Sequence, residues 1–60
     1  MEVFIVKSNG YEDGESIIEG VFRYSNDAKA ALRDLRKNMD PLDKEWLFYT
    51  LESAEVIEDY

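Results

Sequence analysis

Three acidic side chains lie close together near the start of the chain: Glu12, Asp13 and Glu15. Carboxylate oxygens can bind a hard cation, but this spacing does not match the D-x-[DN]-x-[DN]-G calcium loop. A catalytic pair of carboxylates would need a pocket, and pockets form between elements of a larger body than 60 residues provide. We therefore interpret these acids as a solvated loop.

The residues that most often carry out catalysis are missing from the composition. The chain has no histidine and no cysteine, so it lacks an imidazole base and thiolate ligands for zinc. The glycine-rich phosphate loops and the G-x-S-x-G motif are also absent from the sequence. We predict a protein that is not an enzyme and that needs no metal or cofactor.

Charge is strongly segregated along the chain, whose net charge is −7. Residues 25–39 have four basic and two acidic residues, a balance of +2, whereas residues 40–60 have seven acids against Lys44, a balance of −6. The excess of acid argues against direct binding of nucleic acid, which depends on neutralising phosphates. The four basic residues lie on one flank of the predicted helix: Lys29, Arg33, Arg36 and Lys37. This flank is either a site that binds an anion or a solvated surface.

The hydrophobic pattern predicts two strands, a helix and a third strand. Residues 1–7 are apolar on both faces, as in a central strand, and Asn9-Gly10 begins a hairpin loop. Residues 16–24 form the second strand, in which Gly20 predicts a kink or bulge. Ser25 or Asn26 is expected to cap the helix, which ends before Met39. Residues 44–58, "KEWLFYTLESAEVIE", are the last strand.

These elements predict an α+β fold, ββαβ, in one domain that spans residues 1–60. A right-handed crossover places the strands of an antiparallel or mixed sheet in the order 2-1-3. Since one helix covers one face of the sheet, the other face should expose apolar side chains to a second copy or to another protein. We expect five residues to contribute to that face: Phe4, Val6, Val21, Trp46 and Phe48.

The ends of the chain and its apolar runs bear on where the protein acts. No apolar run approaches the roughly 20 residues that cross a membrane, so we expect no membrane association. The start "MEVFIVKSNG" lacks the features of a signal peptide. We therefore expect a cytoplasmic protein.

The frame "VFIVKSNGYEDG", then "IIEGVF", a capped helix and an aromatic strand that runs into "EVIE" resembles small uncharacterised ββαβ proteins of bacteria and their phages. Its local signature is Glu19 to Phe22 followed by Ser25. The resemblance implies a phage or prophage context, in which small acidic proteins often inhibit host or defence proteins by binding them. It carries over no functional residue.

Two functional hypotheses follow. The first is a phage-type inhibitor that binds a bacterial host or defence protein, in the host cytoplasm if a phage encodes it; mimicry of nucleic acid is a special case. Its contacts are expected in the C-terminal segment rather than in the hairpin loop, at four acids: Glu52, Glu55, Glu58 and Asp59. The second is a structural or regulatory homodimer without inhibitory activity.

Overall fold

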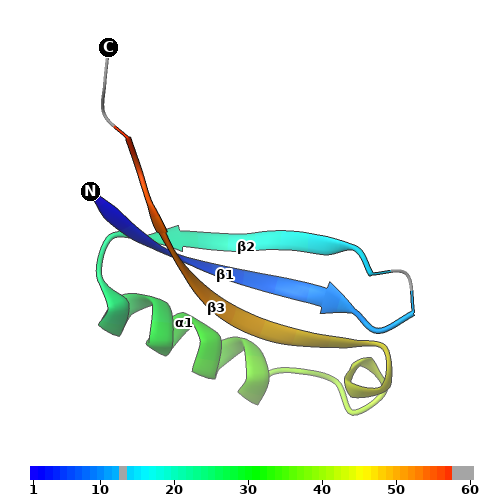
Figure 1. Ribbon diagram of the computed structural model, residues 1–60. Helices are drawn as coiled ribbons and strands as arrows, with labels where there is room; N and C mark the ends of the chain where they lie inside the picture. The colour runs from blue at the N-terminus through cyan, green and yellow to red at the C-terminus, as the bar shows by residue number, and fades with distance from the viewer. Residues whose placement is uncertain (13, 58–60) are drawn as a thin grey trace.

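The computed structural model describes residues 1–12 and 14–57, which form a flat α+β unit (Figure 1). The elements follow in the order β1 (Glu2–Gly10), β2 (Ser16–Phe22), α1 (Ser25–Lys37), the short 3-10 helix η1 (Asp43–Glu45) and β3 (Leu47–Glu55). The three strands lie in the order β2-β1-β3, and β1 is antiparallel to both neighbours. The ββαβ topology and the 2-1-3 order are therefore confirmed, with a sheet that is antiparallel throughout.

The core lies between β1 and α1. Val6 of β1 and Ala28 of α1 are completely buried, and they are the only buried apolar residues in the described part of the chain. Ala28 has a small side chain, which lets the helix backbone approach the sheet closely. Val6 pairs with Leu51 of β3 on one side and with Gly20 of β2 on the other. The central strand thus supplies the fully buried side chain of the sheet.

The predicted composition of the open face is partly wrong. Phe4 pairs with Phe22 and Val6 with Gly20, so these positions share the face that α1 covers. Val21 lies opposite Ile5 and therefore faces away from the helix. Phe4 is only partly exposed and Val6 is buried beneath the helix, so neither contributes to the open face. The residues on both faces of β1 are apolar, and the complete burial of Val6 shows which of the two faces meets the helix.

The prediction that Trp46 belongs to the last strand is also wrong, because β3 begins at Leu47 rather than at residue 44. The Asp40 carboxylate accepts a hydrogen bond from the Leu42 amide at 3.0 Å, and the Asp40 carbonyl accepts one from the Asp43 amide at 2.9 Å. These bonds start the turn of η1, which ends when the Trp46 amide donates to the Asp43 carbonyl at 3.0 Å. Local turn bonds therefore hold residues 43–46 out of the strand.

The start of the helix differs from the expected cap by one residue. Tyr24 occupies the N-cap position in an extended conformation, and the Ala28 amide donates to its carbonyl at 3.2 Å. Ser25 is already helical, and no side chain of the described residues caps the helix. Only Arg23 and Tyr24 lie between the end of β2 and the start of the helix.

Gly20 marks a β-bulge, as predicted. The pairing shifts between Val6, which lies opposite Gly20, and Lys7, which lies opposite Ile18, so Glu19 is the extra residue of β2. A Cβ atom on Gly20 would lie 2.8 Å from Cε2 of the Phe22 ring, so the ring packs where only glycine leaves space. Bulges change the direction in which neighbouring side chains point. Here Glu19 faces α1, where the Ser8 hydroxyl donates to its carboxylate at 3.0 Å.

Candidate functional site

Acidic residues from two distant segments meet at one end of the molecule, which we call the acidic end. The Tyr11 amide donates to the Trp46 carbonyl at 2.9 Å, and this bond ties the β1–β2 connection to the segment that precedes β3. Figure 1 shows both connections at the same end of the sheet. The described acids of this end are Glu12, Glu15, Asp40, Asp43 and Glu45, beside Lys44. The fold thus concentrates charge that the sequence divides between two segments.

Aromatic side chains accompany these acids. The rings of Tyr11 and Phe48 contact each other with their centroids 4.8 Å apart and their planes tilted by 41°. Tyr11 is 60% exposed and Trp46 is 55% exposed. Tyrosine and tryptophan are enriched at protein interfaces because they combine a large apolar surface with a polar group. The acidic end therefore offers apolar contact area as well as charge.

Two of the acids that were predicted to contact a partner form ion pairs within the chain. The Lys7 ammonium lies 2.9 Å from the Glu52 carboxylate, and the N-terminal ammonium of Met1 lies 2.9 Å from the Glu55 carboxylate. Both glutamates remain exposed, but their charges are partly balanced. Glu58 and Asp59 lie outside the described residues. The two described acids of this predicted contact surface are thus ion-paired, and they lie in the C-terminal half of β3, away from the acidic end.

The basic helix flank lies beside the outer edge of β3. The Arg36 guanidinium donates to the Tyr49 carbonyl of β3 at 3.3 Å, and the other three residues of this flank, Lys29, Arg33 and Lys37, are exposed. Charged side chains that cover part of an edge strand discourage pairing with further strands. This contact gives Arg36 a structural role at the sheet edge.

The open face of the sheet is more polar than the sequence suggested. Val21 and Phe48 lie on it as predicted, together with Ile18. A polar row crosses it near the acidic end, where β1 ends and β2 begins: the Asn9 amide donates to the Thr50 hydroxyl at 3.0 Å, and the Ser16 hydroxyl donates to Asn9 at 2.7 Å. Phe48 therefore lies at one end of this face, apart from Ile18 and Val21.

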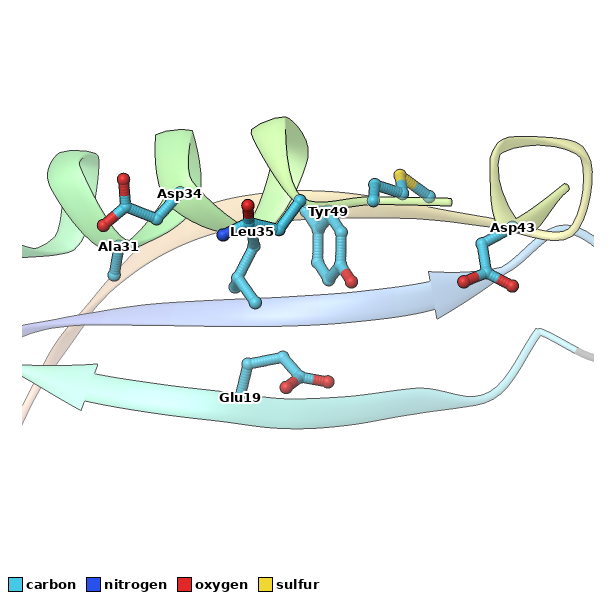
Figure 2. Close-up of a pocket in the computed structure, with 8 residues that line it drawn as sticks. Glu19, Ala31, Asp34, Leu35, Asp43 and Tyr49 are labelled. Carbon is cyan, nitrogen blue, oxygen red and sulfur yellow. The ribbon is translucent and has the colours of Figure 1, made fainter. Parts of the chain in front are cut away.

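A groove of about 440 Å³ lies between the C-terminal half of α1 and the sheet (Figure 2). Figure 2 shows Leu35 and Tyr49 pointing into the space between helix and sheet, with Glu19 rising from β2 and Asp43 at the end near η1. The residues that line the groove are Glu19, Ala31, Asp34, Leu35, Asn38, Met39, Asp43 and Tyr49. The groove could not be predicted from the sequence, because only the bulge at Gly20 turns Glu19 toward the helix.

The described residues lack two features that mark other classes of protein. Within residues 1–12 and 14–57, no group of three or more acidic side chains is arranged to hold a metal ion. The same residues contain no helix that is long and apolar enough to cross a membrane. No protein-family model matches the chain, and neither a curated protein nor a solved structure matches it significantly.

Proposed function

We propose that this chain is a small protein-binding module without enzymatic activity, which inhibits a bacterial host or defence protein in the manner of phage inhibitors. The acidic end binds a basic surface of that partner in the cytoplasm. One observation carries the proposal: Glu12 and the acids of residues 40–45 converge beside the exposed rings of Tyr11 and Trp46.

The charge distribution supports this assignment of the binding surface. Like charges that the fold gathers at one end repel each other, and a basic partner surface relieves this repulsion. Complementary charge also raises the rate of association and disfavours wrong partners. Glu52 and Glu55 already have cationic neighbours, so they have less to gain from a partner than the acidic end has. A partner groove that binds nucleic acid is a special case of such a basic surface.

Capture from a bacterial lysate with matched baits tests the proposal. The triple variant Glu12→Gln/Asp40→Asn/Glu45→Gln removes three charges from the acidic end, and asparagine at position 40 keeps an oxygen for the Leu42 amide. The control Glu2→Gln/Asp27→Asn/Glu55→Gln removes three charges from elsewhere. We expect the wild type and the control to capture one protein stoichiometrically, and the triple variant to lose most of it.

Two outcomes would overturn the proposal. The first is that no protein is captured in stoichiometric amounts. The second is that the control loses its partner as fully as the triple variant, because binding would then depend on total charge and not on the acidic end.

The open face supports a second candidate function, a structural or regulatory homodimer. Ile18, Val21 and Phe48 are exposed on a chain whose described core contains only two fully buried apolar residues. Covering a large apolar side chain contributes roughly 1.5–3 kcal/mol, which is large against the ~3–5 kcal/mol that so small a core supplies. We propose that two copies pair through these faces.

Sedimentation equilibrium over a hundredfold range of concentration tests the homodimer. We expect a mass near twice the 7.0 kDa of the chain, which falls to that of the monomer in the variant Val21→Lys. The control Tyr24→Lys also adds a charge at an exposed residue, outside the sheet, and should leave the mass unchanged. A mass near 7.0 kDa for the wild type at every concentration would refute pairing.

A further inference from the structure

The groove between α1 and the sheet has the properties of a site for a long cationic side chain. We infer that it receives an arginine or lysine side chain of the partner protein, an inference that rests on the proposed function. The groove opens beside η1, next to the acidic end, so a partner seated on the acidic end can reach it. Its volume of about 440 Å³ falls within the range of roughly 300–1,000 Å³ that is usual for ligand sites.

The apolar part of the groove suits the hydrocarbon stem of such a side chain. Leu35 of α1 and Met39, two residues beyond the end of the helix, line the groove, and the Tyr49 ring extends into it from β3. Arginine and lysine bury their methylene groups along apolar surface while the charged group stays at a polar position. Burying the stem removes apolar area of both molecules from water.

The polar part of the groove suits the charged group. Three carboxylates line it, those of Glu19, Asp34 and Asp43, and no lysine or arginine of the described residues does. Asn38 and the Tyr49 hydroxyl add neutral acceptors. The carboxylates therefore favour a cation. The apolar surface favours a cation with a hydrocarbon stem and disfavours a small hydrated ion.

The β-bulge at Gly20 explains why the Glu19 carboxylate lies in the groove. Strict alternation from Gly20, which lies opposite Val6, would place Glu19 on the open face. The extra residue turns Glu19 toward the helix instead, and the Ser8 hydroxyl fixes one of its oxygens at 3.0 Å. Ser8 is itself buried, so one carboxylate of the groove is held in position before any ligand arrives.

A titration of the intact protein with small probes tests the inference without the partner. The probes are the Nα-acetyl, N-methylamide derivatives of arginine and lysine, together with citrulline, a neutral analogue close in shape to arginine. NMR chemical shifts of backbone amides report where each probe binds. We expect saturable shifts at Leu35, Asn38, Met39 and Tyr49 with both cationic probes, and at least tenfold weaker binding of the citrulline probe.

Matched variants separate the groove from general attraction to an acidic protein. Asp34→Asn/Asp43→Asn removes two charges from the groove and should weaken binding of the arginine probe at least fivefold. Glu2→Gln/Asp27→Asn removes two charges outside it and should leave binding nearly unchanged. Equal weakening by both variants, equal binding of citrulline, or shifts that do not saturate would each overturn the inference.

The two proposals can fail separately. If the probes do not bind but the acidic end still captures a protein, the groove assignment is wrong and the proposed function stands. If the probes bind but no protein is captured, the groove binds a cationic side chain and the proposed function is wrong.

Discussion

Replacing Val6 by alanine should lower the free energy of unfolding by about 1.5–3 kcal/mol, which is roughly a third or more of the ~3–5 kcal/mol expected for a core of this size. Val6 is completely buried at the centre of the sheet, between Leu51 and Gly20 and beneath α1. Removing its two methyl groups loses their burial and leaves a cavity that a thin two-layer fold cannot easily close. Urea unfolding followed by circular dichroism measures the change.

Val21→Ala is the matched control, because it makes the same chemical change on the opposite face of the sheet. Val21 is 56% exposed, so we expect the free energy of unfolding to fall by less than about 0.5 kcal/mol, measured at a concentration where the protein is monomeric. Equal losses for the two variants would contradict the assignment of the faces. A larger loss of stability for Val21→Ala than for Val6→Ala would mean that the helix covers the face that carries Val21.

The second large effect concerns the rate at which the partner associates. At low ionic strength, Glu12→Gln/Asp40→Asn/Glu45→Gln should slow association with the captured partner roughly tenfold, because charges at the contact surface steer the encounter. The difference should shrink in 1 M salt, where charges are screened beyond about 3 Å. Surface plasmon resonance at several salt concentrations separates the association rate from the dissociation rate.

The control for this measurement is again Glu2→Gln/Asp27→Asn/Glu55→Gln, which carries the same change in net charge. We expect it to slow association much less than the triple variant does. A slower rate in the control than in the triple variant would locate the steering charges at the other end of the molecule. A difference that persists in 1 M salt would show that the substitutions act by something other than charge.

The topology could be predicted from the sequence because it depends on strong local patterns. Residues 16–32 change from a strand pattern to a helix pattern, and Gly20 marked the irregularity of β2. The faces could not be predicted in the same way. The alternating residues on both faces of β1 are apolar, so only the burial of Val6 in the folded structure shows that Val6 and not Ile5 meets the helix.

The candidate site was harder to predict than the fold because it depends on contacts between distant segments. Glu12 and Glu45 are far apart in sequence, and the bond between Tyr11 and Trp46 brings their segments together. The ion pairs of Glu52 with Lys7 and of Glu55 with the N-terminus depend on the pairing of β1 with β3. The net charge of each segment of the sequence does not indicate these contacts, because they join residues that are distant in sequence.

Chemical labelling of carboxylates in the complex with the captured partner tests most directly whether the acidic end is the binding surface. Carbodiimide coupling modifies accessible aspartate and glutamate side chains, and mass spectrometry locates each modified residue. We predict that the partner protects Glu12, Asp40 and Glu45, while Glu2, Asp27 and Glu55 are labelled as in the free protein. Protection of Glu55 with full labelling of Glu12 and Glu45 would contradict the account.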